Sequence, residues 1–171
     1  MKTTLKRRAF IAPLVLAGFA SWLRPWARGA DRVSEPVDFS TTANEALQAM
    51  TRRADELNIK KVAVVAFIEG DRVTSWSSKM VVVGSMKTTP TEKDRGSNLL
   101  GIAYAKAAEM ANSLKDSGTA GRPPLTGEFG WQGGVIAKTK TGYVIAAFSG
   151  GPSEDDVRVA RAGLQLLVSR L

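Results

Sequence analysis

The sequence predicts an α/β fold in which a single antiparallel sheet is flanked by helices. The sequence contains two pairs of short apolar runs, and within each pair a short turn joins the two runs. Parallel strands need a long crossover connection, so each pair is predicted to form an antiparallel hairpin. Helical apolar spacing precedes, separates and follows the two pairs. The chain has 171 residues and is 44% apolar, which fits one core-forming domain and a tail.

The first helical pattern begins at Ser40 or Thr41 and ends at Asn58. Its apolar residues recur at three- and four-residue spacing: Ala43, Ala46, Leu47, Met50, Ala54 and Leu57. This spacing places them on one face, so the segment is predicted to be an amphipathic helix.

The first strand is predicted over Val62 to Ile68, a continuous apolar run of strand length. Glu69 to Asp71 makes a turn, and Arg72 to Trp76 is predicted as the hairpin partner. Residues 79–84 either extend this second strand or form a separate short one. The polar residues 86–96 are expected to form a loop.

The second half of the chain repeats this arrangement. A longer helix is predicted from Leu99 to Leu114, where apolar residues and alanines follow helical spacing. Glycines and prolines fill Thr119 to Gly130, which favours a loop. Gly133 to Ala137 is then predicted to pair, through a turn at 139–142, with the strand Tyr143 to Phe148.

A glycine loop joins this last strand to a final helix. Ser149 to Pro152 breaks regular structure, and Ser153 is predicted as the N-cap, with three acidic residues in the first turn where they complement the helix dipole. The predicted apolar face is Val157, Ala160, Leu164, Leu167 and Val168. Such a loop exposes N–H groups that can hold an anionic group. The alternative is a tight turn that uses glycine only for its backbone freedom.

The formal charge of +8 is concentrated near the N-terminus. Six of the 24 basic residues lie in the first thirty positions, which contain no acidic residue, and removing them leaves a net charge of +2. Nucleic-acid binding is therefore not predicted. The chain has no cysteine and no histidine, which excludes disulfides, the usual zinc sites, cysteine nucleophiles, and histidine as catalyst or haem ligand.

Residues 1–30 predict a cleaved signal peptide of the twin-arginine type. Lys6 to Ile11 (KRRAFI) is similar to the twin-arginine export motif, and a short apolar stretch and small residues follow it. The alternative is an uncleaved, membrane-anchoring N-terminus, although the apolar stretch is shorter than the about 20 residues a span needs. We therefore expect a linker over 31–39, a domain over 40–171, no stable membrane span in the mature form, and a periplasmic or secreted location.

Three stretches of the domain carry a family resemblance. They are Gly133 to Ile136 (GGVI), Gly142 to Gly151 (GYVIAAFSGG) and Val159 to Leu164 (VARAGL), with Asp155 and Asp156 between the last two. In combination they resemble the family that includes haem-binding HbpS-like proteins, the GlcG proteins and the C-terminal domain of PduO-type proteins. The resemblance implies one α/β domain of profilin-like or PAS-like shape that assembles into homo-oligomers, and several relatives bind haem or a corrinoid.

The resemblance also implies a ligand pocket in which cations meet carboxylates and an indole packs on a flat ring. Its predicted residues are Lys106, Arg122, Trp131, Gly133, Gly134, Gly150 and Gly151. From the sequence alone, Lys106 is a helix-surface residue and Trp131 a partly buried anchor. Haem is the cofactor that the resemblance implies, but the chain departs from the haem-binding pattern because it has no histidine. Met80 and Tyr104 are the candidate metal ligands, with core packing as their alternative role.

Two functions remain open at this point. The first is an exported protein that binds or senses a small anionic or tetrapyrrole-like molecule without turnover. The second is an enzyme or accessory subunit of small organic acid metabolism. The missing histidines and cysteines favour the first function, and no catalytic residue is predicted.

Overall fold

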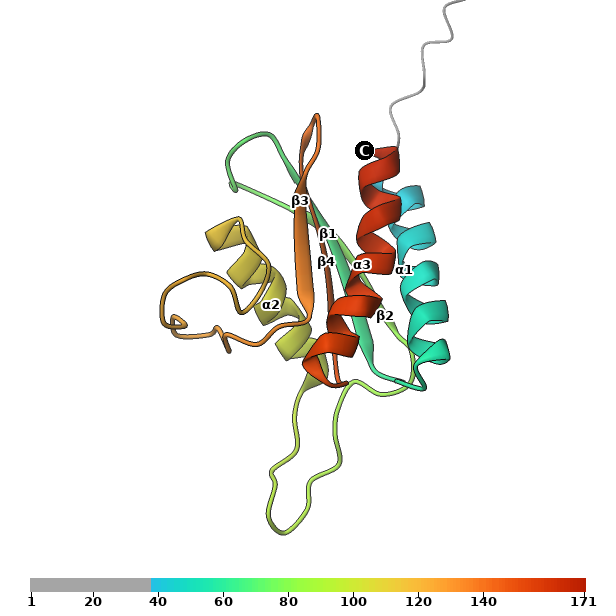
Figure 1. Ribbon diagram of the computed structural model, residues 1–171, viewed down its shortest axis with the longest axis vertical. Helices are drawn as coiled ribbons and strands as arrows, with labels where there is room; N and C mark the ends of the chain where they lie inside the picture. The colour runs from blue at the N-terminus through green and yellow to red at the C-terminus, as the bar shows by residue number, and fades with distance from the viewer. Residues whose placement is uncertain (1–37) are drawn as a thin grey trace, which may run out of the picture. The chain divides into compact units, whose positions relative to one another are not determined.

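The computed structural model describes residues 38–171, which form three helices and four strands (Figure 1). In chain order they are α1 (Phe39–Glu56), β1 (Val62–Glu69), β2 (Ser77–Val82), α2 (Leu99–Ser113), β3 (Gly134–Lys138), β4 (Gly142–Ser149) and α3 (Ser153–Arg170). The predicted signal peptide and most of the predicted linker lie outside the described residues. Within residues 38–171, none of the helices has the length and hydropathy that a bilayer span requires.

The four strands form one sheet in the order β2-β1-β4-β3, and every pair in it is antiparallel. The second predicted hairpin forms as β3 and β4, whereas β1 pairs with a later segment than predicted. The two hairpins join through β1 and β4, whose pairing runs from Val62 with Ser149 to Glu69 with Gly142. The central strands are therefore β1 and β4. The predicted α/β fold, a single antiparallel sheet flanked by helices, is confirmed.

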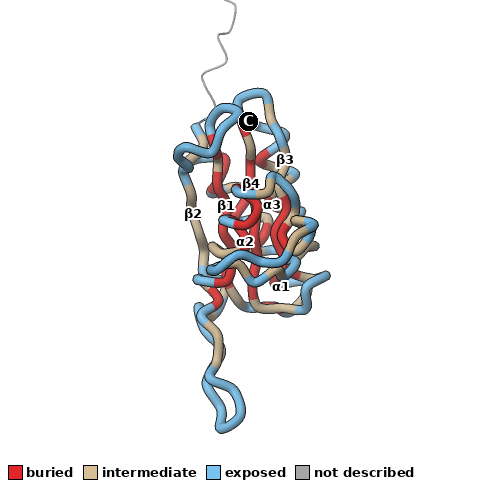
Figure 2. The backbone as a smooth tube through the Cα atoms, turned by 90° about the vertical axis from the view of Figure 1, so that its left-hand side faces the viewer, coloured by how far each residue is buried: buried red, intermediate tan, exposed pale blue. Residues whose placement is uncertain are grey.

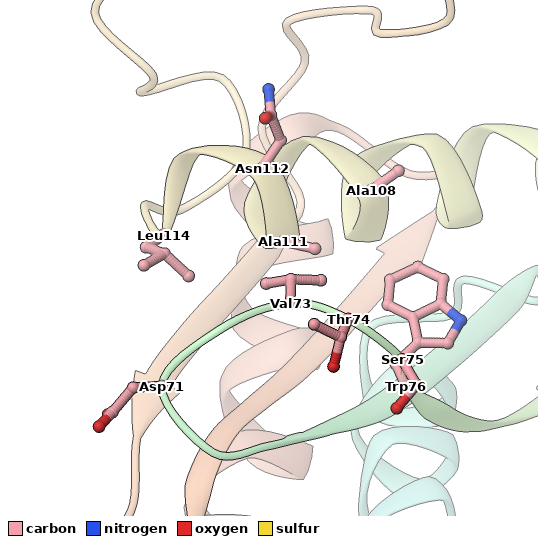
Figure 3. Close-up of a pocket in the computed structure, with 9 residues that line it drawn as sticks. All are labelled: Asp71, Val73, Thr74, Ser75, Trp76, Ala108, Ala111, Asn112 and Leu114. Atoms are coloured by element: carbon pink, nitrogen blue, oxygen red, sulfur yellow. The ribbon is translucent and has the colours of Figure 1, made fainter.

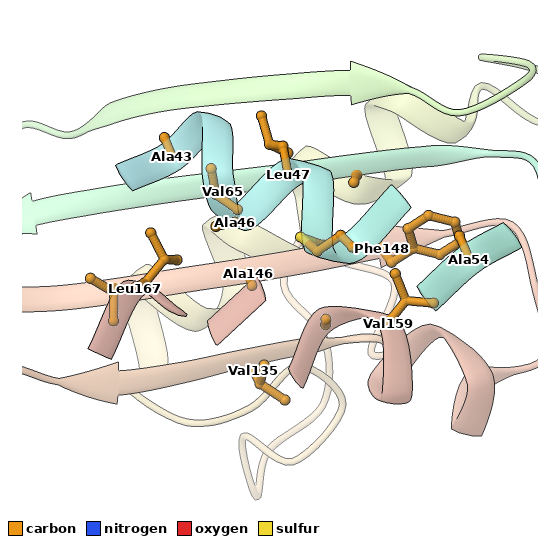
Figure 4. Close-up of a cluster of buried hydrophobic side chains, with 14 of the residues drawn as sticks. Ala43, Ala46, Leu47, Ala54, Val65, Val135, Ala146, Phe148, Val159 and Leu167 are labelled. Atoms are coloured by element: carbon orange, nitrogen blue, oxygen red, sulfur yellow. The ribbon is translucent and has the colours of Figure 1, made fainter. Parts of the chain in front are cut away.

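Helices cover both faces of the sheet, with α1 and α3 on one face and α2 on the other (Figure 1). Successive side chains of β1 alternate between the two sides: Ala63 and Val65 pack in the cluster under α1 and α3 (Figure 4), while Val62 and Val64 pack under α2. Both faces of the central strands are thus buried. This explains why β1 is a continuous apolar run rather than an alternating one.

The helices α1 and α3 lie against each other as well as against the sheet. A side chain at Gly163 of α3 would collide with the Met50 side chain of α1, so the glycine sets how closely the two helices approach. The predicted apolar face of α1 is confirmed at Ala43, Ala46, Leu47, Met50 and Ala54. The helix begins at Phe39, slightly earlier than predicted, because the Asp38 carboxylate caps it by accepting the N–H groups of Ser40 and Thr41.

The second strand differs from its prediction. Arg72 to Trp76 forms an exposed connection, and the partner of β1 is β2, which begins at Ser77. Burial decides this register, because Val81 packs on the core under α1 and α3 while Met80 packs on the α2 side. The segment 79–84 therefore supplies most of the second strand instead of extending one that begins at Arg72.

The predicted polar loop between β2 and α2 is confirmed. It runs away from the sheet and is mostly exposed (Figure 2). An isolated bridge between Lys87 and Asn98 closes its base.

The final helix is also corrected in two details. Its N-cap is Pro152 rather than Ser153, and no side chain caps its first turn. Its buried face is Asp156, Val159, Ala160, Gly163 and Leu167, whereas Val168, predicted on the buried face, is 45% exposed. Because Asp156 is drawn inward, the helix is rotated relative to the face that the apolar residues alone predict.

Candidate functional site

The glycine loop between β4 and α3 surrounds a buried ion pair. Gly151 donates its backbone N–H to Asp156 Oδ1 at 2.8 Å. Lys106 of α2 donates its Nζ to Asp156 Oδ2 and to the carbonyl oxygen of Phe148, each at 2.8 Å. Lys106 and Asp156 are each 3% exposed. The anionic group at this loop is therefore a carboxylate of the chain itself.

Burial shifts both members of this pair away from their charged forms. It lowers the pKa of Lys106, and the Asp156 carboxylate opposes that shift. It raises the pKa of Asp156, against the opposing effects of Lys106 and of the backbone N–H groups of Gly151 and Gly150. The ion pair connects α2, β4 and α3.

Two of the predicted glycines, Gly133 and Gly151, contact the ion pair, whereas Gly134 and Gly150 pack against other side chains. At Gly133, whose φ is +131°, an added Cβ would collide with Lys106 Nζ and the Asp156 Cβ. At Gly134 it would collide with the Met110 methyl group. Lys106 and Gly133 therefore lie close together, and the ion pair leaves no space at Gly133 for a side chain. The prediction from the sequence alone that Lys106 lies on the helix surface is wrong.

Arg122 and Trp131 lie in the loop between α2 and β3, where they make different contacts. The Arg122 guanidinium binds both carboxylate oxygens of Glu128, at 2.7 and 2.8 Å. Trp131 is 51% exposed, and its ring centroid is 4.9 Å from that of Phe129. The hydrogen bonds of Arg122 go to Glu128 and Pro123, not to the Lys106 ion pair. The ligand-binding role of the seven predicted residues stays a prediction.

An apolar groove lies elsewhere, between the β1–β2 connection and α2 (Figure 3). It has a volume of about 610 Å³, and its lining residues are Asp71, Val73, Thr74, Ser75, Trp76, Ala108, Ala111, Asn112 and Leu114. Val73 and the Trp76 ring lie between the connection and the helix in Figure 3. Asp71 is the charged residue of this lining, and Lys138 Nζ lies 2.9 Å from its carboxylate.

Neither candidate metal ligand lines this groove, although Tyr104 lies beside Trp76. The Tyr104 ring centroid is 6.5 Å from that of Trp76, and its hydroxyl is 3.4 Å from Ser78 Oγ. Met80 and Tyr104 both pack, half-buried, on the core cluster under α2. Core packing thus accounts for both side chains. Within residues 38–171, no group of three or more acidic, histidine or cysteine side chains is placed to hold a metal ion.

A second cavity, of about 440 Å³, lies against the loop that holds Arg122. Its wall includes Glu109 of α2, a buried carboxylate that sequence reasoning missed. Glu109 follows Lys106 by three residues and precedes Met110, so helical spacing places it beside the buried face. An acidic residue beside the apolar face of a predicted helix is the sequence signal that could have indicated a buried carboxylate here.

Comparison with known proteins gives little beyond this geometry. No protein-family model and no curated protein matches the chain. Among the solved structures that are similar, two have a TM-score of 0.42 each. One is HbpS, 19% identical over 82% of this chain and 97% of that chain. The other is a double glutamate-to-aspartate mutant of HbpS from Streptomyces reticuli, 20% identical over 93% of this chain and 99% of that chain. At this distance neither likeness assigns a ligand or a reaction.

Proposed function

We propose that this chain is an exported binding or sensing protein for a flat, mainly apolar small molecule, and that it acts by sequestration without turnover. A tetrapyrrole is the ligand class that the sequence resemblance suggests. The observation that carries the proposal is the groove beside Trp76, where apolar side chains that would ordinarily be buried line one concave surface.

The lining of the groove suits a planar ring. Ala108 and Ala111 are small, so a ligand can approach the backbone of α2 closely. Val73, Trp76 and Leu114 are 45%, 36% and 42% exposed, which leaves apolar surface for a ligand to cover. An indole that is already partly ordered by a neighbouring aromatic ring offers a face for stacking.

Haem fits this lining only in part. The ring can pack against the apolar wall, but the lining contains no residue of ordinary haem-ligand type, and the chain has no histidine. The propionates also lack a cation among the lining residues, whose one charged member is Asp71. We therefore propose that the groove holds the ring of a tetrapyrrole and contributes no ligand to its metal.

The alternative function, in small organic acid metabolism, has less support. Arg122 is the predicted cation that could meet the carboxylate of a small acid. Glu128 already binds that guanidinium through two hydrogen bonds, so an acid would have to displace an internal carboxylate.

Titration of the purified chain with metal-free protoporphyrin IX and with haem tests the proposal. We expect protoporphyrin to bind, and Trp76→Ala to raise its Kd by about tenfold, the size expected when an aromatic packing partner is lost. Trp131→Ala is the matched control, because it removes the other tryptophan of the described residues, and we expect a change within about twofold. Haem should give a weak Soret shift without histidine character.

Two results would reject this assignment. If Trp131→Ala weakens binding and Trp76→Ala does not, the ligand binds at the predicted residues around Arg122 and Trp131. If neither porphyrin binds, the tetrapyrrole proposal is wrong.

A further inference from the structure

Glu109 is a buried carboxylate with one unsatisfied oxygen. The residue is 2% exposed, and its Oε1 accepts the backbone N–H of Gly118 at 2.9 Å. Its Oε2 is the one buried side-chain oxygen or nitrogen within residues 38–171 that has no hydrogen-bond partner. Buried carboxylates normally have every oxygen paired, because an unpaired one loses its hydration without compensation.

The side chain of Glu109 forms part of the wall of the 440 Å³ cavity. The other lining residues come from the following loop: Gly118, Ala120, Gly121, Arg122, Pro123, Pro124 and Gly130. Three of them are glycines, so much of this wall is backbone, with carbonyl oxygens available to a donor. The cavity can therefore offer one carboxylate oxygen and several carbonyl oxygens to a ligand.

Arg122 lies close enough to Glu109 for that carboxylate to help raise the Arg122 pKa, but its hydrogen bonds go to other groups. Arg122 donates to both oxygens of Glu128 and to the carbonyl oxygen of Pro123. Its hydrogen bonds lower the pKa of Glu128 to about 2, so this carboxylate stays ionised and keeps the guanidinium. The guanidinium is therefore hydrogen-bonded to Glu128 and not to Glu109, whose Oε2 is left without a hydrogen-bond partner.

We infer that this cavity binds the ammonium group of a small amine, with Glu109 Oε2 as the acceptor. A primary ammonium has three N–H donors and one positive charge. Glu109 Oε2 is buried in the structure, so to accept one donor the Glu109 side chain must turn towards the cavity. The other two donors suit backbone carbonyl oxygens. This site is separate from the groove beside Trp76, and it stands or falls independently of the proposed function.

Lys115 is the internal competitor for this site. Its Nζ lies 3.4 Å from the carbonyl oxygen of Ala120, and an added Cβ at Gly121 would be 3.7 Å from it. The side chain itself is exposed. If the Lys115 side chain moved, its own ammonium group could donate to Glu109 Oε2. The experiment must therefore distinguish Lys115 from an added amine as the partner of this oxygen.

We would titrate the ¹⁵N-labelled full chain with methylammonium chloride and follow the chemical shift of the Gly118 amide, which donates a hydrogen bond to Glu109. Tetramethylammonium chloride at equal ionic strength is the matched control, because it carries the same charge and no N–H donor. We expect a saturable shift with methylammonium only. In Glu109→Gln the affinity should fall at least about tenfold, since the charged acceptor is lost. Glu92→Gln, which neutralises an exposed loop carboxylate, should bind like the parent.

Several outcomes would overturn the inference. They are equal shifts with both cations, no saturable shift, or unchanged affinity in Glu109→Gln. Methylammonium binding seen only in Lys115→Met would also overturn it, because Lys115 would then be the natural occupant. The comparison of the two cations uses the unmodified chain, so it decides the question even if a variant fails to fold.

Discussion

Asp156 and Glu109 are two buried carboxylates in the same small domain, and they are treated differently. Each accepts a backbone N–H from a glycine, Gly151 in one case and Gly118 in the other. The second oxygen of Asp156 is bonded to Lys106, whereas the second oxygen of Glu109 has no partner within residues 38–171. One carboxylate is fully paired and the other is half paired.

The difference indicates different roles. The fully paired carboxylate joins three elements of the fold and leaves no room for a ligand. The half-paired carboxylate costs stability, about 1–3 kcal/mol for an unsatisfied buried group, and it borders a cavity. A structural role accounts for both oxygens of Asp156. The unpartnered oxygen of Glu109 has no such role within the described residues, and the proposed ligand would supply its partner.

The largest effect is expected from neutralising the two carboxylates with isosteric amides. Asp156→Asn leaves Lys106 buried without its counter-charge, so we expect a loss of about 3–5 kcal/mol in the free energy of unfolding. Glu109→Gln keeps an oxygen for the Gly118 N–H and breaks no other hydrogen bond of this side chain, so we expect a change of less than about 1 kcal/mol. Urea unfolding of both variants measures the difference. Equal losses would mean that Glu109 is as structurally committed as Asp156.

A smaller effect is expected from crowding the ion pair. Gly133→Ala places a Cβ against Lys106 and Asp156 at a φ of +131°, so strain and collision act together. Gly127→Ala is the matched control, because its φ of +94° is also positive but no atom lies within 4 Å of the added Cβ. We expect a loss of about 1–3 kcal/mol in the control from backbone strain alone, and a clearly larger loss at Gly133. Equal losses in urea unfolding would show that the ion pair is not tightly enclosed.

The fold was predictable because its signals are local. Turn residues and short apolar runs predict each hairpin, and helical spacing predicts each helix within a few residues. The register of β2 was not predictable, because it depends on Val81 meeting helices that lie far away in the sequence. The sequence also contains no local signal that rotates α3, since Asp156 turns inward only to meet Lys106.

The candidate site was less predictable, for the same reason. Spacing could not show that Lys106 is buried against Gly133 or that Asp156 is its partner. The groove beside Trp76 is built from a connection and a helix that pack only in the folded chain. Whether Glu109 is paired depends on the loop that follows α2, whose conformation its glycines and prolines leave open.

The smallest expected effect concerns Glu128, the carboxylate that keeps Arg122 away from Glu109. The hydrogen bond from Arg122 and the N–H of Leu125 lower the pKa of Glu128 from 4.5 to about 2. A lowered carboxyl pKa means that the closed loop binds its proton less readily than the open loop does. The contribution of this pair to loop closure is therefore complete above pH 4.5 and is lost as the pH falls towards 2.

The Leu125 amide, which donates to Glu128 at 2.8 Å, reports this titration directly. We expect its chemical shift to change with a midpoint near pH 2, and Glu128→Gln to abolish that step. Asp156 should not contribute to the loss, since burial raises its pKa and shifts its titration in the opposite direction. A midpoint near 4.5 would show that Glu128 is not held by Arg122. The guanidinium would then be free to neutralise Glu109, and the contrast between the two buried carboxylates would disappear.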